Sequence, residues 1–170
     1  MIIGNSGSGK STLAKRLGEI TGLPVLHMDQ FYWEPGWNMR SDEDMKCMVS
    51  AAIKKEKWIF DGNYSRGFEE RSERSDVIVF LDISRWLCLF RVIRRAISSY
   101  GVTRDDMATD CPERFNRDFL KFLKFIYDYP TRSRPKALAL VKNAPEQVRT
   151  HHLKNKMEVA AFLKSARMIN

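Results

Sequence analysis

Apolar positions along the chain follow two patterns. Short runs of consecutive apolar residues, several of them β-branched, are typical of strands buried on both faces of a parallel sheet. Such runs lie within residues 1–3, 24–28, 57–64, 76–82 and 146–151. Elsewhere, apolar residues recur every three or four positions, which predicts amphipathic helices. The predicted helices span residues 10–20, 41–55, 85–99, 112–130, 136–142 and the stretch after Asn155.

Turn and capping residues set the expected ends of these helices. Gly22 follows the first helix, and Ser41 and Ser84 precede two others, where a hydroxyl can cap free backbone N–H groups. The three acidic residues directly after Ser41 also indicate the start of a helix, because acidic side chains are stabilised by the positive end of the helix dipole. We expect Pro112 to begin a further helix and Pro130 to end it, because proline lacks the N–H group that a helix interior needs.

Strands that alternate with helices predict an α/β fold. We expect a single three-layer domain over residues 1–170, with helices on both faces of a parallel sheet. A chain of this length buries roughly 70% of its unfolded surface, which is enough for one core. Residues 100–145 interrupt the alternation, because predicted helices follow one another there without a strand. This stretch is therefore expected to form an insertion over one end of the sheet.

The composition, with 44% hydrophobic and 29% charged residues, is that of a globular protein in water. No run approaches the roughly 20 apolar residues that span a bilayer, and no basic-then-apolar leader is recognisable. Cys47, Cys88 and Cys111 are far apart and show no CxxC spacing, so we expect reduced thiols in a cytoplasmic protein. The chain has only three histidines, two of them adjacent, which does not fit a zinc cage.

The net charge of +8 is concentrated in the second half of the chain. Residues 84–150 carry 14 basic and 7 acidic side chains, whereas residues 1–83 carry 11 and 13. The predicted helix 112–130 has a basic stripe beside an apolar one. The basic stripe contains Arg114, Arg117, Lys121 and Lys124, and the apolar stripe contains Phe115, Phe119, Phe122 and Ile126. Positive charge of this kind fits a phosphate-bearing ligand, a nucleic-acid backbone or an ordinary solvated surface.

The most specific motif lies between the first predicted strand and the first predicted helix. It reads GNSGSGKST and satisfies the phosphate-binding pattern G-x-x-x-x-G-K-[ST]. Glycines let backbone N–H groups approach phosphate oxygens, and the start of the helix adds its positive dipole end. Lys10 is expected to reach the outer phosphates of ATP, and the Ser11 hydroxyl to bind Mg²⁺. The predicted ATP-binding residues are Gly4, Asn5, Ser6, Gly7, Ser8, Gly9, Lys10, Ser11 and Thr12.

The rest of the sequence narrows the class of phosphate-loop protein. A GTPase needs guanine-reading residues such as N-K-x-D, and the run VKNAPE does not match them. A large motor or transporter ATPase needs a much longer chain. A small kinase therefore fits best.

Three segments resemble adenylate kinases, shikimate kinases and related small-molecule kinases: GNSGSGKSTLAKRLG, WIFDGNYSR and VIVFLDISRWLCLFRVIRR. Over nearly all 170 residues, including LPVLHMDQFYW and CPERFNRDFLKF, the chain is most similar to adenylate-kinase-like proteins labelled DNA topology modulation proteins. That label describes a cellular effect and says little about chemistry. The resemblance implies a P-loop NTPase fold with strand order 2-3-1-4-5, a helical lid at residues 101–135, and the use of ATP and Mg²⁺.

The resemblance also implies roles for individual side chains. An acid at the end of the strand beside the phosphate loop holds Mg²⁺ through water, and this corresponds to Asp61, with Asp82 as the alternative. Gly62 favours Asp61, because it leaves room for a substrate. Asp29 is the candidate that orients or deprotonates the acceptor hydroxyl; alternatively, it only caps the following loop.

Arginines are the expected partners of the transferred phosphoryl group. Arg91 and Arg95 lie one helical turn apart, and Arg132 and Arg134 correspond to the returning edge of the lid. Arg66 is a candidate contact for the acceptor. The alternative is that each of them is a surface or structural residue.

The aromatic stretch after Asp29 is expected to be a loop that either walls an acceptor site or packs in the core. It contains Phe31, Tyr32, Trp33 and Trp37. The sequence thus predicts an ATP- and Mg²⁺-dependent kinase for a small acceptor, such as a nucleoside, a nucleotide or a sugar-like acid. The alternative is a nucleotide-responsive DNA-binding or regulatory protein, although no helix-turn-helix or zinc finger is recognisable. The sequence specifies neither the acceptor nor the oligomeric state.

Overall fold

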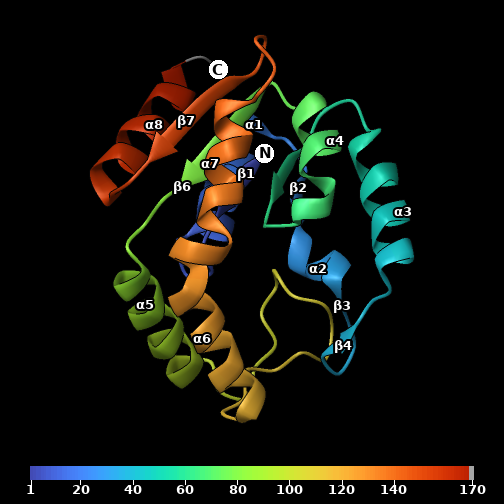
Figure 1. The fold of residues 1–170 in the computed structure, drawn as a ribbon, viewed down its shortest axis with the longest axis vertical. Coiled ribbons are helices and arrows are strands. Elements are labelled where there is room, and N and C mark those ends of the chain that lie inside the picture. Colours follow the sequence, from blue (N-terminus) through green and yellow to red (C-terminus); the bar gives the residue numbers. More distant parts are fainter. Residues whose placement is uncertain (169–170) are drawn as a thin grey trace.

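A five-stranded parallel sheet lies at the centre of the computed structural model, which describes residues 1–168 (Figure 1). Its strands are β1 (Ile2–Gly4), β2 (Val25–His27), β5 (Ile59–Asp61), β6 (Val77–Leu81) and β7 (Arg149–Leu153), in the order β2-β5-β1-β6-β7. The labels differ from the expected 2-3-1-4-5 because a separate antiparallel hairpin, β3 (Trp33–Glu34) and β4 (Asn38–Met39), takes two numbers. Counted within the main sheet alone, the order is 2-3-1-4-5.

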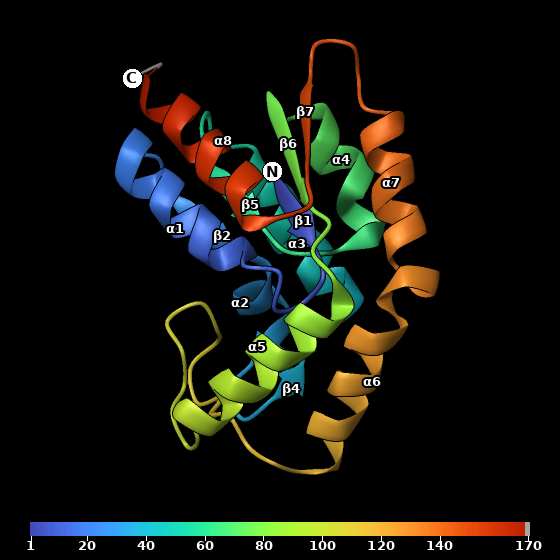
Figure 2. The same cartoon turned by 90° about the vertical axis from the view of Figure 1, so that its left-hand side faces the viewer.

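Helices cover both faces of the sheet, as Figure 2 shows. On one side lie α1 (Lys10–Thr21) and α8 (Lys156–Met168), and on the other α4 (Phe68–Glu73) and α7 (Arg134–Lys142). Side chains along a strand alternate between the two sides. In β6, Val79 and Leu81 enter the core with α1 and α8, whereas Ile78 and Phe80 enter the core with α4 and α7. The predicted three-layer α/β fold is therefore confirmed.

Two more helices lie beyond the carboxyl ends of the strands. α5 (Arg85–Ser98) comes directly after β6, and α6 (Arg117–Arg132) runs alongside it (Figure 2). Between them, residues 99–116 form an irregular connection, called here the 99–116 segment. It is fixed to the β3–β4 region, because Gly36 N–H donates to the Asp110 carbonyl at 2.9 Å and Trp37 Nε1 to the Pro112 carbonyl at 3.0 Å.

The predicted helix 112–130 was wrong at both ends. α6 begins at Arg117, because the Asn116 side chain caps it by accepting from Phe119 N–H at 2.9 Å. Pro130 lies inside α6, which continues to Arg132. Proline leaves the carbonyl four residues earlier, that of Ile126, without its helical donor. Asn5 Nδ2 from the phosphate-binding loop donates to this carbonyl at 3.0 Å instead.

Short elements after β2 and β5 were not predicted. The aromatic stretch expected to be a loop contains α2 (Met28–Tyr32) and the β3–β4 hairpin, while α3 (Asp42–Ile53) follows as expected. After β5 come a 3₁₀ turn, Ser65–Gly67, and α4. Arg71 of α4 is fully buried, and its guanidinium donates to three backbone carbonyls: those of Gly62, Tyr64 and Gly67. Patterns of apolar residues do not count an arginine as a core position, so they could not predict the turn that Arg71 holds.

Capping expectations had mixed outcomes. The Ser41 hydroxyl accepts from Asp44 N–H at 3.1 Å, as expected. Asn155 caps the last helix, because its Oδ1 accepts from Glu158 N–H at 3.0 Å. Ser84 precedes α5 but makes no side-chain cap. Among residues 1–168, no helix has both the length and the apolar character needed to cross a membrane.

Candidate active site

The phosphate-loop motif forms a tight turn between β1 and α1. Gly9 has a φ of 99°, a left-handed conformation that favours glycine, and it adds no side chain to the first turn of α1. Gly7 is packed so closely that a Cβ atom there would lie 2.5 Å from the Cys88 carbonyl of α5. The start of α1 therefore presents backbone N–H groups and its positive dipole end to the space in front of the loop.

The Asn63 side chain supports the base of the loop through two hydrogen bonds. Asn63 accepts from Gly4 N–H at 3.1 Å and donates to the Gly4 carbonyl at 2.7 Å, so it fixes the end of β1. Gly4 and Asn5 are buried, whereas the residues from Ser6 to Thr12 line a cavity. The loop is thus held at its base and open at its tip.

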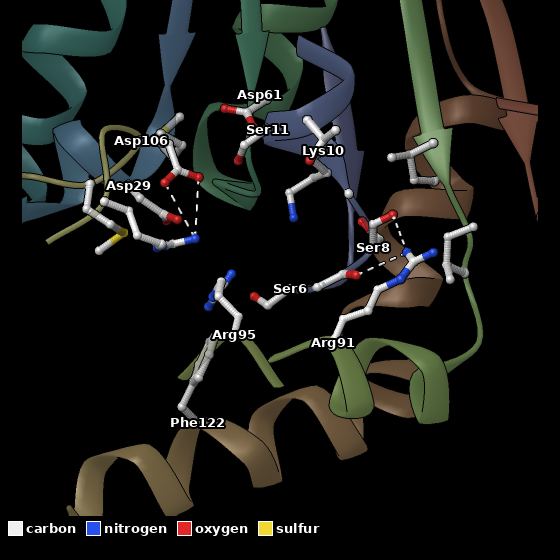
Figure 3. Close-up of a pocket in the computed structure, with 18 of the residues that line it drawn as sticks. Ser6, Ser8, Lys10, Ser11, Asp29, Asp61, Arg91, Arg95, Asp106 and Phe122 are labelled. Atoms are coloured by element: carbon white, nitrogen blue, oxygen red, sulfur yellow. Dashed lines mark hydrogen bonds and ion pairs between the residues drawn. The ribbon is translucent and has the colours of Figure 1, made fainter. Parts of the chain in front are cut away.

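The cavity lies at the carboxyl ends of the strands and has a volume of about 1130 Å³. Small-molecule sites commonly occupy about 300–1,000 Å³, so this cavity has room for a nucleotide and a second molecule. Lys10 points into it (Figure 3), and its Nζ donates to the Asn5 carbonyl at 2.9 Å. Burial lowers the pKa of Lys10, while the carboxylates of Asp61 and Asp29 oppose that shift.

Asp61 ends β5 inside this cavity. It is 2% exposed, and its Oδ1 lies 2.7 Å from Nδ1 of His27, the residue beside it on β2. Burial disfavours the charged imidazole, but the contact with Asp61 outweighs burial and raises the pKa of His27. The next residue, Gly62, is not the open space expected for a substrate, because a Cβ atom there would lie 2.3 Å from that of Met28.

Asp82, the alternative acid, ends β6 but is not among the residues that line the cavity. Its carboxylate accepts two hydrogen bonds from Arg134, both at 2.8 Å, and lies 2.8 Å from His152 Nε2. These contacts outweigh burial and lower the pKa of Asp82. Arg134 is therefore placed on Asp82, and Arg132 is exposed on the surface; neither lines the cavity.

The arginines of α5 do reach the cavity. Arg91 Nη1 donates to the carbonyls of Gly7 and Ser8 at 3.4 and 3.3 Å, which places a cation beside the phosphate loop (Figure 3). Arg95, one turn further along, lines the same cavity, and its Nε lies 3.0 Å from Glu113 Oε1. Arg66 instead pairs with Asp42 on the surface.

Sequence reasoning missed three charged residues of the 99–116 segment that line the cavity: Arg104, Asp106 and Glu113. Arg104 lies 3.5 Å from Asp106 and 3.4 Å from Glu113. Burial opposes ionisation of Asp106, but Arg104 and a hydrogen bond from the Ser11 hydroxyl outweigh it and lower the pKa of Asp106. Asp29 lies in the same wall, where removal from bulk water raises its pKa, against the charge of Lys10. Alternating acids and arginines in TRDDMATDCPER were the available sign of this network.

The aromatic stretch divides between the two roles considered for it. Phe31 packs on Phe60 in the core, with ring centroids 5.2 Å apart. Trp33 and Trp37 line the cavity and contact each other edge to face, at 5.2 Å. Indole rings in this arrangement form one apolar wall of the cavity.

Two of the four cations of the predicted basic stripe are paired, whereas Arg114 and Arg117 are exposed. Lys121 pairs with Asp118 at 2.8 Å and Lys124 with Asp128 at 2.7 Å, both within the same helix. A nucleic-acid surface needs cations that are free to neutralise phosphates. The two paired lysines contribute little to such a surface, and the DNA-binding alternative stays a hypothesis.

No protein-family model and no curated protein sequence matches this chain. Solved structures of small-molecule kinases are similar to it in fold. A shikimate kinase from Acinetobacter baumannii, in complex with shikimate, has a TM-score of 0.59 at 14% identity, covering 99% of this chain and 89% of that one. A shikimate kinase from Bacteroides thetaiotaomicron has a TM-score of 0.57 at 14% identity, and the match covers 99% of this chain and 95% of that one. A gluconokinase from Sinorhizobium meliloti has a TM-score of 0.52 at 16% identity, and the match covers 98% of this chain and 87% of that one.

These similarities establish the fold: the chain is built like the P-loop small-molecule kinases. At such low identity they do not transfer an acceptor or a catalytic residue. They also give no support to the label concerning DNA topology, which stays a prediction from sequence resemblance.

Proposed function

We propose that this protein transfers a phosphoryl group from ATP to a small-molecule acceptor. The observation that carries the proposal is a single cavity in which the phosphate loop, Lys10 and the carboxylate of Asp29 face the same space. Phosphoryl transfer depends mainly on positioning and charge stabilisation, and this cavity combines both.

The ATP phosphates are proposed to bind to the backbone N–H groups of the loop at the start of α1. Lys10 exchanges its hydrogen bond with the Asn5 carbonyl for phosphate oxygens. Arg91, already beside Gly7 and Ser8, adds a planar two-pronged donor for charge on the transferred group. The 99–116 segment is proposed to cover this space as part of a lid, which excludes water that would otherwise hydrolyse ATP.

The oxygen donors here fit Mg²⁺. They are the Ser11 hydroxyl, the Asp61 carboxylate acting through water, and the Asp106 carboxylate that Ser11 already contacts. When bound, the ion neutralises charge on the phosphates. Asp29 is proposed to accept the proton of the acceptor hydroxyl, since its raised pKa makes it a better base than an ordinary aspartate.

The charges around Asp29 favour a neutral acceptor. Arg95 and Arg104 act electrostatically on Asp29, but both are already paired with Glu113. A carboxylate-bearing acceptor would have to compete for them. A nucleoside instead presents hydroxyl groups and a planar ring that can pack on Trp33 and Trp37.

The test is ADP formation with ATP and Mg²⁺ across nucleosides, nucleoside monophosphates and sugar acids, above the acceptor-free rate. We expect a nucleoside to stimulate turnover and Lys10→Ala to reduce it by at least about a hundredfold. Lys54→Ala, an exposed lysine outside the cavity, is the matched control. Full turnover by folded Lys10→Ala would contradict phosphoryl transfer at this site, and stimulation by sugar acids alone would contradict only the nucleoside.

A further inference from the structure

Helix α5 has a second apolar face that the described chain leaves open. Trp86, Phe90, Ile93 and Ile97 are 61%, 61%, 40% and 65% exposed, respectively. Their spacing of four, three and four residues places them along one side of the helix. The opposite side, with Cys88, Val92 and Ala96, is fully packed in the core. None of the four exposed residues lines the cavity, so the substrate site does not account for them.

Helix α6 extends this apolar surface. Tyr127 packs edge to face on Trp86, with ring centroids 5.6 Å apart, and it is 43% exposed. Leu120, two turns earlier on α6, is 65% exposed. At the other end of α5, Tyr100 stacks on Phe115, which shows that the two helices run antiparallel. We call Trp86, Phe90, Ile93, Ile97, Leu120 and Tyr127 the α5–α6 apolar face.

The area of this face is that of half an interface between proteins. With about 150–250 Å² for an aromatic side chain and somewhat less for an aliphatic one, the exposed fractions amount to roughly 600–700 Å². The largest apolar patch of a typical monomer is about 300–600 Å². A standard interface buries about 800 Å² on each partner, including its polar rim. Two such faces packed together would therefore bury an area close to that of a standard protein–protein interface.

Only some of the charges beside the face are compensated within the chain, because Arg94 of α5 and Arg117 of α6 are exposed. Lys121 and Lys124 pair with Asp118 and Asp128 of the same helix. The Arg85 guanidinium lies 4.3 Å from the Tyr127 ring centroid, where a cation is attracted to the aromatic face. The area of the face, rather than the charge of its rim, therefore points to a second copy, and an anionic surface is an outcome that the test must exclude.

We propose that the α5–α6 apolar face joins two copies of this chain. The interface is isologous, so α5 and α6 of one copy pack on α5 and α6 of the other as a four-helix bundle across a twofold axis. The cavity stays outside the contact, because it is lined from other sides of α5, including Arg91 and Arg95.

The test is the molar mass of the full chain over a concentration series, by sedimentation velocity or light scattering after size exclusion. We expect twice the monomer mass for the native protein. Phe90→Glu and Ile97→Glu, separately and together, should halve it, because a buried unpaired carboxylate opposes association. Met157→Glu, at a 79% exposed methionine on α8, should keep the native mass. Circular dichroism and cooperative thermal unfolding report whether each variant is folded.

Three results would overturn the proposal. The first is a native protein that is monomeric throughout the series. The second is a dimer that survives both substitutions. The third is a monomer that binds vesicles containing phosphatidylglycerol through Trp86 and Phe90, which would make this face a membrane contact. If the glutamate variants do not fold, Phe90→Ala with Ile97→Ala takes their place and should raise the dimer dissociation constant by at least about tenfold.

Discussion

The ends of β5 and β6 each carry an aspartate, yet the two side chains have different surroundings. Asp61 is the last residue of β5 and is level with Val79 of β6 across the sheet, whereas Asp82 follows the end of β6. Asp61 lines the cavity, and its carboxylate contacts His27 of the neighbouring strand β2. Asp82 is held by Arg134 and His152, away from the cavity. The comparison shows that the partners an aspartate reaches distinguish the two cases: Asp61 belongs to the proposed reactive site, and Asp82 to a structural ion pair.

The largest expected difference between the two acids is in turnover. Asp61→Asn should lower ATP-dependent phosphorylation by at least about a hundredfold, because the charge next to Lys10 and the proposed metal position is lost. The amide keeps the size of the side chain, so the fold should remain. Single-turnover assays with ATP and Mg²⁺ measure the effect. Asp76→Asn, at an exposed acid outside the cavity, is the control, and equal rates for both variants would contradict the assignment.

The opposite effect is expected at β6. Asp82→Ala should reduce the free energy of unfolding by about 2 kcal/mol, less than for a fully buried pair, because Arg134 is partly exposed and its interaction is screened. Turnover should stay within about threefold of the native value. Urea unfolding gives the stability, and the acceptor assay gives the rate. A large rate loss without loss of stability would assign Asp82 to the active site instead.

A smaller effect concerns pH at the Asp61–His27 pair. Folding raises the pKa of His27, so the charged pair stabilises the native state fully below the unfolded pKa near 6.5. This contribution is lost as pH rises through the higher folded pKa. The difference in unfolding free energy between the native protein and His27→Gln should therefore shrink from about pH 6 to about pH 9. A difference that grows with pH would contradict the pair.

The smallest effect tests a third strand end, at β1. Asn5→Ala should cost about 1–2 kcal/mol of unfolding free energy, because the Ile126 carbonyl loses its donor. In a Pro130→Ala background the helix regains an N–H group for that carbonyl, and the cost should fall. A double-mutant cycle by urea unfolding measures the coupling. Equal costs in both backgrounds would show that the asparagine acts independently of the proline.

Much of the fold could be predicted because its patterns are local. The apolar runs at β1, β5 and β6 and the motif at Gly4–Thr12 each depend on neighbouring residues, and all of them lie where the sequence predicts. The positions of Arg132 and Arg134 were not predictable in this way. Their separation from the cavity depends on Asp82 and on the continuation of α6 past Pro130.

The parts that could not be predicted depend on contacts between distant segments. Asp106 reaches Ser11 only because the 99–116 segment folds back over α1. The Arg71 guanidinium is buried by carbonyls that a sequence pattern does not show. For α5, the sequence reveals apolar residues on two sides but not which side faces the core. Only the packing of Val92 and Ala96 decides this, and it leaves Phe90 outside.

Because Gly7 packs against the Cys88 carbonyl of α5, the proposed nucleotide site and the proposed dimer contact involve the same helix. The loop that is proposed to hold the phosphates packs directly on α5, and the opposite side of this helix is the proposed dimer interface. If pairing stiffens that helix, ATP should bind more tightly as the protein is concentrated, and by thermodynamic reciprocity ATP should promote pairing. The affinity for ATP would then depend on the concentration of the protein itself.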